Sequence, residues 1–356
     1  MDTYTSYDLV EYGKPLQARL REMPKPKASE VLVRVRRSGV CHSDLHIGSG
    51  HMDLGEEGVL SMAERGIKLP VAMGHEILGE VVALGPDADP EAAPVGKTML
   101  VFPWTGCGDC LACEELREND CLAPRFMGLV QDGGYATHAL VRHPRYLVDV
   151  EGLDPDTVTP HACSGLTVYN ALKKAGPLRE GEWLAVMGTG GLGLNAIAIA
   201  RAMGYKQILA VDNNAVKLQA AVEMGADKTL DSSAADALDQ LKALTDNRLL
   251  AVIDTVGVPA TSRLAVHALI KTGRYVCVGL HGGDFKMPLP WLPQKALTVC
   301  GCHVGSSLLL RELIELVKTG KVKEIPVESR PLSAVAQTLD DLKAGNITGR
   351  VVLNGD

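Results

Sequence analysis

Short runs in which apolar and polar residues alternate dominate the first 150 positions of the chain. Residues 30–40 (EVLVRVRRSGV) and 76–85 (EILGEVVALG) are rich in β-branched side chains and are bounded by Gly and Pro clusters. Few segments in this region have a helical period, although residues 59–66 (VLSMAERG) predict one short helix. The pattern predicts a β-rich, barrel-like unit.

The pattern changes near residue 165, where strand-like apolar runs begin to alternate with helical ones. The alternating segments are residues 182–188, 192–204, 207–212, 215–225, 249–257, 260–270 and 273–279. Strands that alternate with helices in this way pair in parallel, and the helices cover the sheet. We therefore predict an α/β fold with a doubly wound parallel sheet in this part of the chain.

The last part of the chain predicts two amphipathic helices and a closing strand. The helices are expected at residues 307–320 and 332–345, and the strand at residues 349–355. We expect this tail to return to the first unit. Two domains follow: residues 1–155, completed by residues 301–356, and residues 156–300.

Composition and charge exclude several classes of protein. Hydrophobic residues make up 46% of the 356 positions and charged residues 22%, which is typical of a soluble globular protein and excludes a disordered chain. The net charge of −7 gives no basic surface for nucleic acid, and no apolar run approaches the ~18 residues of a membrane span. The first residues carry acids where a signal peptide carries cations, so we predict a cytoplasmic protein.

A glycine-rich turn follows the first strand of the predicted parallel sheet. Gly188, Gly190 and Gly193 form G-x-G-x-x-G at the start of a helix, which lets a pyrophosphate approach the backbone and the helix N-terminus. Asp212 ends the next strand, about 20 residues further on, where a carboxylate accepts hydrogen bonds from ribose hydroxyls. The two asparagines that follow offer no cation for a 2′-phosphate, so the pattern predicts NAD rather than NADP. The alternative is a turn of this kind that binds nothing.

Four of the nine cysteines lie close together in the sequence. They are separated by two, two and seven residues: Cys107, Cys110, Cys113 and Cys121. Cys-x-x-Cys spacing lets neighbouring sulfurs face one centre, and four thiolates complete a tetrahedral zinc site without an open position. An iron–sulfur cluster needs the same thiolates, but the spacing matches neither common ferredoxin pattern, and disulfides are disfavoured in the cytosol. We predict a structural zinc that stabilises this loop.

Residues 39–48 (GVCHSDLHIG) place one cysteine, two histidines, a serine and an aspartate within ten positions. This stretch alone is compatible with a polar turn that holds a buried cysteine. His75, at the start of an apolar strand, and Cys163, where the pattern changes, favour chemistry instead. Two thiolates and one imidazole, from Cys41, Cys163 and His75, form a catalytic zinc set that leaves the fourth position for water or substrate.

These motifs together resemble the zinc-dependent alcohol dehydrogenases of the medium-chain dehydrogenase/reductase superfamily, and the resemblance extends over nearly the whole chain. The matching segments, in order, are GVCHSDLH, GHE, the four-cysteine loop, CSGLT, GTGGLG with its later aspartate, and TGR near the C-terminus. The resemblance implies a β-rich, GroES-like catalytic domain and a Rossmann NAD-binding domain. It also implies two zinc ions per chain, one catalytic and one structural.

The same resemblance implies roles for individual residues. Ser43 and His46 would relay a proton to solvent. Asp44 would orient His75 from behind, and Glu76 would be a nearby carboxylate. The cofactor-binding residues implied are His42, Thr167, Gly188, Gly190, Gly191, Leu192, Gly193, Asp212, Lys217 and Arg350.

The implied reaction is the reversible oxidation of a primary or secondary alcohol to an aldehyde or ketone, with hydride transfer to NAD. Zinc acts as a Lewis acid on the alcohol oxygen, and the cofactor accepts the hydride. Phe102 and Trp104 fall near the aromatic wall beside the alcohol in the family, which would favour primary or aromatic alcohols. Two alternatives are a zinc-free reductase of activated alkenes on the same fold and a non-catalytic dinucleotide-binding relative. The ligand set argues against the first, and the proton path against the second.

The segment between His46 and His75 is longer than it commonly is in this family. It is either a lid or wall that shapes the mouth of the substrate cleft or a solvated surface loop. The expected partners are a small-molecule alcohol, aldehyde or ketone and further copies of the chain, as a tetramer or dimer. Neither nucleic acid nor a membrane is expected as a partner.

Overall fold

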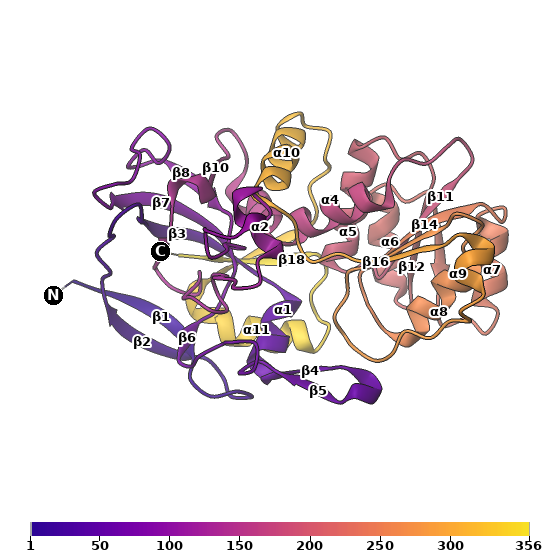
Figure 1. Ribbon diagram of the computed structural model, residues 1–356, viewed down its shortest axis with the longest axis horizontal. Helices are drawn as coiled ribbons and strands as arrows, with labels where there is room; N and C mark the ends of the chain where they lie inside the picture. Colours follow the sequence, from indigo (N-terminus) through magenta and orange to yellow (C-terminus); the bar gives the residue numbers. More distant parts are fainter. Residues whose placement is uncertain (1, 356) are drawn as a thin grey trace.

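The computed structural model describes residues 2–355 and contains two bodies side by side (Figure 1). One is rich in β-strands and includes both ends of the chain, and the other is a parallel sheet flanked by helices. The mixed α/β architecture expected from the apolar pattern is confirmed.

Two sheets form most of the β-rich body. The smaller sheet has the strand order β2-β1-β6, and the larger has the order β10-β8-β7-β3-β18-β17 with β9 paired to β3. These strands are β1 (Thr3–Leu9), β2 (Gln17–Glu22), β3 (Val31–Val40), β6 (Val71–Ala72), β7 (Glu76–Leu84), β8 (Thr98–Val101), β9 (His138–Val141), β10 (Leu147–Asp149), β17 (Val327–Pro331) and β18 (Arg350–Asn354). Val31, Val33 and Val35 of β3 are buried because side chains alternate between the two faces of a strand.

The second body is a six-stranded parallel sheet with the order β13-β12-β11-β14-β15-β16. Its strands are β11 (Trp183–Met187), β12 (Ile208–Asp212), β13 (Lys228–Asp231), β14 (Leu249–Asp254), β15 (Arg274–Cys277) and β16 (Thr298–Gly301). Its helices are α4 (Ser164–Ala175), α5 (Gly191–Ala202), α6 (Ala215–Glu223), α7 (Ala237–Leu244), α8 (Pro259–Ala268) and α9 (Trp291–Lys295). The strand order reverses between β11 and β14, and in such sheets a ligand binds outside the carboxyl ends of the strands at that point.

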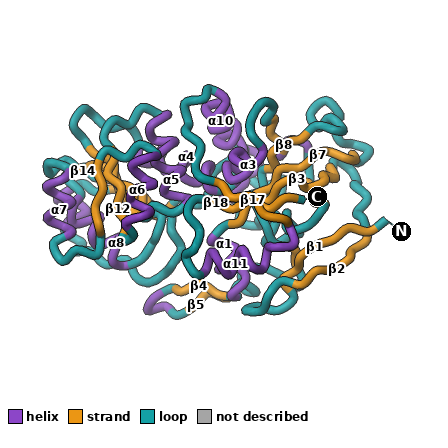
Figure 2. Tube along the Cα trace, turned by 180° about the vertical axis from the view of Figure 1, so that it is seen from behind, coloured by secondary structure: helices purple, strands orange, loops and turns teal. Residues whose placement is uncertain are grey.

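The C-terminal part of the chain returns to the β-rich body. α10 (Ser307–Lys318) and α11 (Val335–Lys343) lead to β18, which pairs antiparallel with β3 and brings Val351 opposite Val40. Figure 2 shows β17 and β18 next to β3 from behind. This pairing places Arg350 close to Cys41, although they lie at opposite ends of the chain.

The prediction of a helix at residues 59–66 is wrong. Residues His51–Asp53 (β4) and Val59–Ser61 (β5) form an antiparallel hairpin, and residues 62–66 make a turn. Pairing between β4 and β5 satisfies the backbone hydrogen-bonding groups of this segment. Met62, the first residue after β5, is completely buried. The apolar side chains therefore belong to a hairpin and the turn after it, not to one face of a helix. The remaining helices are short: α1 (His42–Ser49), α2 (Leu111–Glu114) and α3 (Pro155–Val158).

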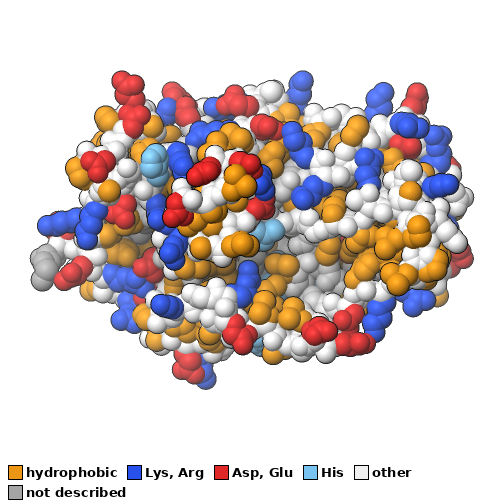
Figure 3. Space-filling model, in the orientation of Figure 1, with side chains coloured by type: hydrophobic (Ala, Val, Ile, Leu, Met, Phe, Trp, Pro, Cys, Tyr) orange, Lys and Arg blue, Asp and Glu red, His pale blue; other side chains and the backbone are white. Residues whose placement is uncertain are grey.

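The surface carries mixed charge. On the face drawn in Figure 3, Lys and Arg side chains are interspersed with Asp and Glu. None of the helices within residues 2–355 combines the length and the apolar character needed to cross a lipid bilayer.

Candidate active site and metal centres

The glycine-rich turn leads from β11 into α5 and brings backbone atoms close together. Gly188 has a φ of +81°, a left-handed conformation that favours glycine. A Cβ at Gly193 would lie 1.9 Å from the carbonyl oxygen of Gly188, so the packing of this helix on its strand requires glycine. A Cβ at Gly190 would meet no atom within 4 Å, so the backbone there faces open space. Open backbone at the start of a 12-residue helix fits a pyrophosphate group.

A cleft of about 370 Å³ lies in front of this turn and is lined by residues of both bodies. Its walls come from α1, the glycine turn, the carboxyl ends of β12 and β15, and the segment before β18. The expected site residues that line it are Cys41, His42, Ser43, His46, Gly188, Gly190, Gly191, Leu192, Asp212, Lys217 and Arg350. The structure therefore brings together most of the residues that the family resemblance assigns to the cofactor.

Asp212 lies at the carboxyl end of β12 and holds the glycine turn. Its Oδ2 accepts hydrogen bonds from the backbone N–H of Thr189 at 2.7 Å and from the Thr189 hydroxyl at 3.0 Å. Its Oδ1 accepts from the backbone N–H groups of Asn213 and Asn214. The carboxylate is thus fixed at the rim of the cleft, where a ribose hydroxyl would share an oxygen with one of these four donors.

Thr167 lies apart from the residues that line this cleft. It is buried in α4, and its hydroxyl donates to the carbonyl oxygen of Cys163 at 2.8 Å. Its observed contact is therefore with the backbone of an expected zinc ligand.

α1 positions several site residues at once because it begins directly after Cys41. Oδ2 of Asp44, the third residue of the helix, accepts the backbone N–H of Cys41 at 2.9 Å and caps the first turn. This contact fixes the Cys41 backbone at the junction between β3 and the helix. His42, Ser43 and His46 follow on the same helix and face the cleft.

Four potential metal ligands meet at the base of α1. A ligand atom from each of Cys41, His75, Glu76 and Cys163 lies within 4.8 Å of the others, and all four residues are buried. Two of them flank the start of β7, one follows β3 and one precedes α4. The structure thus assembles the three ligands expected for a catalytic zinc, together with the expected neighbouring carboxylate.

The His75 imidazole tests whether this cluster fits a metal ion. The ring is completely buried, and Nε2 has no hydrogen-bond partner among the described residues. Nδ1 lies 3.2 Å from Oδ1 of Asp44, although at an angle outside that of a regular hydrogen bond. A buried ring nitrogen without a partner is costly, and an ion next to two thiols would satisfy it. The donor set therefore fits zinc held by Cys41, His75 and Cys163.

The two thiols of the cluster differ in their pKa values. A hydrogen bond with Cys163 lowers the pKa of Cys41 well below its usual value, and the same contact raises the pKa of Cys163. Burial acts to lower the pKa of His75, but Asp44 and Cys41 outweigh it and raise that pKa well above its usual value. The cluster therefore favours a thiolate at Cys41, which is the form that binds a metal ion.

Glu76 forms an ion pair next to this cluster. Both of its carboxylate oxygens accept a hydrogen bond from Nη2 of Arg350, and both side chains are buried. The approach requires glycine on the neighbouring strand, since a Cβ at Gly39 would lie 1.9 Å from Oε2 of Glu76. Burial raises the pKa of Glu76 to about 7, and the Arg350 guanidinium opposes that effect. Nε of Arg350 has no partner among the described residues, so one donor is free for a further acceptor.

Ser43 and His46 lie on α1 and line the same cleft as Cys41. Oγ of Ser43 is 3.8 Å from Sγ of Cys41, and His46 lies one helical turn further along. Burial lowers the pKa of His46, which leaves the ring neutral near pH 7. The pair can therefore accept a proton that leaves the buried end of the cleft.

His281 is a residue of this site that the sequence motifs do not reveal. It follows β15 and lines the cleft opposite α1, with its ring centroid 6.0 Å from that of His42 and 6.2 Å from that of His46. A polar residue just beyond the carboxyl end of a parallel strand is a general sign of a ligand site, and that sign alone could have identified it.

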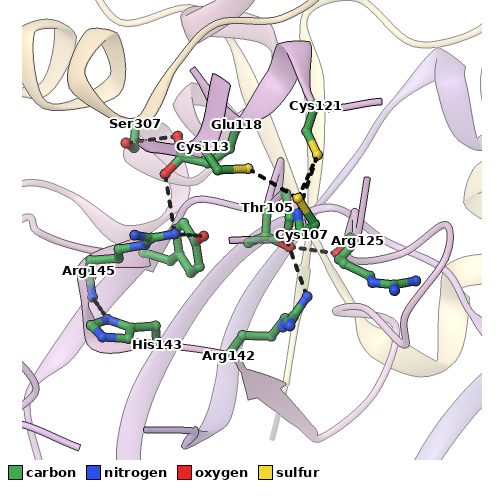
Figure 4. Close-up of polar contacts among 12 residues, drawn as sticks. Thr105, Cys107, Cys113, Glu118, Cys121, Arg125, Arg142, His143, Arg145 and Ser307 are labelled. Carbon is green, nitrogen blue, oxygen red and sulfur yellow. Dashed lines mark hydrogen bonds and ion pairs between the residues drawn. The ribbon is translucent and has the colours of Figure 1, made fainter. Parts of the chain in front are cut away.

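The four-cysteine cluster lies on a loop of the β-rich body, where the sulfurs of Cys107, Cys113 and Cys121 point toward one another (Figure 4). The Sγ–Sγ distances are 3.5 Å for Cys107–Cys121, 3.9 Å for Cys107–Cys113, 3.5 Å for Cys110–Cys113 and 3.7 Å for Cys110–Cys121. Four sulfurs at about 2.3 Å from zinc in a tetrahedron are about 3.8 Å apart. The spacing therefore fits zinc, and all nine cysteines are free of disulfides.

A buried carboxylate attaches this loop to the rest of the molecule. Glu118 is completely buried, and its Oε2 accepts a hydrogen bond from the hydroxyl of Ser307 on α10 at 3.3 Å (Figure 4). A guanidinium nitrogen of Arg145 lies 4.0 Å from its Oε1. The loop must keep its shape for this buried charge to keep its partners.

The two aromatic residues expected near the substrate lie in different surroundings. Trp104 packs beside His75, with ring centroids 5.2 Å apart, and its Nε1 donates to the carbonyl oxygen of Ala162. Phe102 is completely buried and stacks on Tyr146, and it is not among the described residues that line the cleft. Trp104 is therefore the one of the two that adjoins the expected zinc ligands.

The hairpin of β4 and β5 reaches from α1 to the parallel-sheet body (Figure 1). At its tip Nζ of Lys286 lies 2.5 Å from Oε1 of Glu56, and the backbone N–H of Glu56 donates to Asp284. A Cβ at Gly282 would lie 2.6 Å from Cβ of Asp53, so the two segments approach closely. The long segment between His46 and His75 thus contacts the loop that carries His281.

Comparison with known families gives two matches in this chain. Residues 27–152 match the family described as "Alcohol dehydrogenase GroES-like domain", and residues 191–319 match the family described as "Zinc-binding dehydrogenase". The first range contains both metal-ligand clusters except Cys163, and the second begins inside the glycine turn.

Relatives and solved structures agree with these matches over nearly the full length. The chain is 36% identical over 348 residues to an NAD-dependent alcohol dehydrogenase of Sulfurisphaera tokodaii, covering 97% of this chain and 98% of the relative. It resembles the crystal structure of the alcohol dehydrogenase of Aeropyrum pernix with a TM-score of 0.88 and 30% identity, covering 98% and 99% of the two chains. It also resembles acetophenone reductase of Geotrichum candidum in complex with NAD, with a TM-score of 0.86, 30% identity and coverage of 99% and 98%.

Proposed function

The chain belongs to the zinc-binding alcohol dehydrogenases of the medium-chain dehydrogenase/reductase superfamily, and we propose that it oxidises a primary or secondary alcohol with NAD at the cleft between its two bodies. One observation carries this proposal. Cys41 belongs to the buried ligand cluster and also lines the cleft that runs along the glycine turn. A metal held at the cluster would therefore face the place where a dinucleotide fits.

Cys41, His75 and Cys163 would hold the catalytic zinc, and the cysteines of the loop would hold a second, structural zinc. When bound, zinc supplies a Lewis acid without redox chemistry of its own, and NAD supplies the carbon that accepts hydride. The alcohol loses a hydride and a proton and becomes an aldehyde or a ketone, and the reverse reaction returns both.

The protein's part is to orient the reactants and to remove the proton. Oγ of Ser43 accepts the proton of the alcohol hydroxyl and passes its own toward the open side of the cleft. His46, neutral near pH 7 because burial lowers its pKa, receives the proton and delivers it to solvent. Arg350 and Lys217, with the open backbone at Gly190, would provide donors for the pyrophosphate and the adenosine ribose, and His42 and Leu192 line the same cleft. The role of Thr167 beside the nicotinamide rests on the family resemblance alone, because Thr167 is not among the residues that line the cleft.

A panel of primary, secondary and aromatic alcohols with NAD tests this function. We expect reduced nicotinamide to form with zinc-loaded protein, activity to disappear when a chelator removes the zinc, and activity to return when zinc is restored. Formation of reduced nicotinamide at an undiminished rate from protein shown to contain no zinc would contradict the proposal.

We propose that the β4–β5 hairpin forms one wall at the mouth of the substrate cleft. The contacts of Glu56 with Asp284 and Lys286 connect it to the loop that carries His281, and Trp104 supplies an aromatic surface next to His75. The alcohol panel applies to this wall as well. Replacing residues 54–58 by a shorter turn should change the ratio of kcat/KM between large and small alcohols, whereas a plain surface loop would leave that ratio unchanged.

Replacing Asp212 by alanine should weaken NAD binding by about 10- to 100-fold and reduce the preference for NAD over NADP. Hydrogen bonds to a charged group contribute about 1.5–3 kcal/mol, and each 1.4 kcal/mol is about tenfold in affinity. The measurement is the dissociation constant of each cofactor by titration of protein fluorescence.

Thr189→Val is the matched control for this prediction. It removes the hydroxyl that donates to Asp212 but leaves the carboxylate in place, so it should affect NAD and NADP to a similar extent. Equal weakening of both cofactors in Asp212→Ala would instead assign the carboxylate only to the shape of the glycine turn.

Three further features belong to this proposal: the division into domains, the oligomeric state and the cellular location. Residues 1–155 with 301–356 would form the catalytic domain and residues 156–300 the NAD-binding domain, as the membership of the strands in the sheets supports. A homo-oligomer, either dimer or tetramer, is supported by β16, an edge strand whose Val299 is 38% exposed. A cytoplasmic location is supported by nine cysteines without a disulfide.

A further inference from the structure

Tyr135 is completely buried in the β-rich body and contacts two of the three segments that carry the expected catalytic zinc ligands. Its backbone N–H donates to the carbonyl oxygen of Met73, two residues before His75. Its ring packs so closely on Gly74 that a Cβ there would lie 2.6 Å from Cδ1 of the ring. Its hydroxyl donates to Oδ2 of Asp44 on α1 at 2.6 Å. Tyr135 thus connects the segment that carries His75, just before β7, to α1, which follows Cys41.

The two carboxylate oxygens of Asp44 contact different groups. Oδ2 accepts the Tyr135 hydroxyl and the backbone N–H of Cys41, and Oδ1 faces Nδ1 of His75 at 3.2 Å. The backbone N–H alone would hold Oδ2 from one side only. The hydroxyl is a second donor on the same oxygen, and a short hydrogen bond to a charged acceptor is among the stronger ones in proteins. Together they fix the rotation of the carboxylate.

We propose that Tyr135 is a positioning residue for the catalytic zinc. By holding Oδ2 of Asp44 it keeps Oδ1 directed at the His75 imidazole, so that Nε2 of His75 is presented to the ion. The inference rests on the proposed zinc site of Cys41, His75 and Cys163 and assigns a role in it to a residue outside the motifs named in the sequence analysis. Without the hydroxyl, the carboxylate can rotate, the imidazole is held less firmly, and zinc leaves faster.

The test is the rate of zinc release from the full-length, zinc-loaded protein into an excess of a coloured chelator. The two zinc ions should leave in separate phases, and Cys163→Ala, which lacks the catalytic site, identifies the phase that belongs to it. We expect Tyr135→Phe to accelerate that phase about tenfold, the lower end of the effect of groups that support metal ligands. The phase of the four-cysteine cluster should not change. Cobalt substitution provides a second readout, because altered visible bands in Tyr135→Phe report a changed ligand geometry.

Tyr275→Phe is the matched control. Its hydroxyl donates to the buried carboxylate of Asp254 at 2.8 Å in the parallel-sheet body, so the variant loses the same kind of bond far from the zinc ligands. Both phases of zinc release should match those of the unaltered protein. The double variant Tyr135→Phe/Asp44→Asn adds a further check, since it should release zinc no faster than Asp44→Asn alone if Tyr135 acts through Asp44.

Equal release rates in Tyr135→Phe and the unaltered protein would overturn the inference, as would equal acceleration in Tyr275→Phe. Failure of Tyr135→Phe to fold while Tyr275→Phe folds would also overturn it, because the hydroxyl would then serve the stability of the β-rich body. If the unaltered protein shows no phase that Cys163→Ala lacks, the proposed zinc site itself is wrong. These outcomes separate the failure of the inference from the failure of the proposed function.

Discussion

Replacing Cys163 by alanine should remove one of two zinc ions and lower turnover about a thousand-fold or more. The variant leaves Cys41 and His75 as the only expected ligands at a completely buried imidazole, which is too few for a stable zinc site. A metal that acts as a Lewis acid lowers the activation barrier by several kcal/mol, and each 1.4 kcal/mol changes the rate about tenfold. Zinc content by elemental analysis and kcat with a good alcohol substrate give the two readouts.

Cys300→Ala is the control for this variant. Cys300 lies on β16, is partly buried and is not part of either metal-ligand cluster. The control should keep two zinc ions and unaltered turnover. Full zinc and full turnover in Cys163→Ala would remove this residue from the ligand set.

Replacing Cys113 by serine should remove the other zinc and lower the melting temperature by about 10 °C. Cys113 is completely buried, and a lost structural zinc releases the loop of residues 107–121. Glu118 on the same loop would then lose its partners Ser307 and Arg145, which leaves a buried charge unpaired. A loss of about 3 kcal/mol lowers the melting temperature by roughly 10 °C in a domain of this size.

The control for Cys113→Ser is Cys300→Ser, and the melting temperature and the zinc content are measured for both variants. Cys300→Ser changes a cysteine to serine outside the cluster and should lower the melting temperature by much less. The catalytic zinc should remain in Cys113→Ser. Iron in place of zinc in the unaltered protein would contradict the assignment of the loop, and so would a Cys113→Ser variant that keeps two zinc ions and melts at the same temperature.

The elements of the parallel sheet were predictable because their burial follows simple rules. β11 and β14 are buried at every residue, so they appear in the sequence as short, largely apolar runs. α4 is not among the predicted elements. Its first six residues, 164–169, are all buried, so no polar face shows the helical period. Residues 59–66, which form β5 and the turn after it, were predicted as a helix, because over only eight residues an apolar pattern does not distinguish a helix from a strand.

The metal ligands were predictable for a different reason. The four cysteines of the loop have the spacing of a zinc site, and thiols at such spacing have few other uses in a reduced chain. Cys41, His75 and Cys163 have no such spacing, and their assignment as zinc ligands came from the family resemblance. The ion pair between Glu76 and Arg350 could not be predicted from the sequence, because the two residues lie 274 positions apart and meet only when β18 pairs with β3.

Tyr135 and His281 show the same limit of sequence patterns. A buried tyrosine in a β-rich segment is not distinguished from core by its sequence, and its hydroxyl partner depends on the tertiary fold. His281 follows a parallel strand, which marks it as a candidate site residue, but its position beside α1 depends on how the two bodies pack. The sequence identified the chemistry of the site, whereas the groups that orient it required the structure.

The most direct test of the catalytic zinc is anomalous X-ray scattering at the zinc absorption edge from crystals of fully active protein. We expect a strong peak between Sγ of Cys41, Sγ of Cys163 and Nε2 of His75, separate from the peak at the four-cysteine loop. No anomalous peak at that position in crystals whose dissolved protein retains full activity would contradict it.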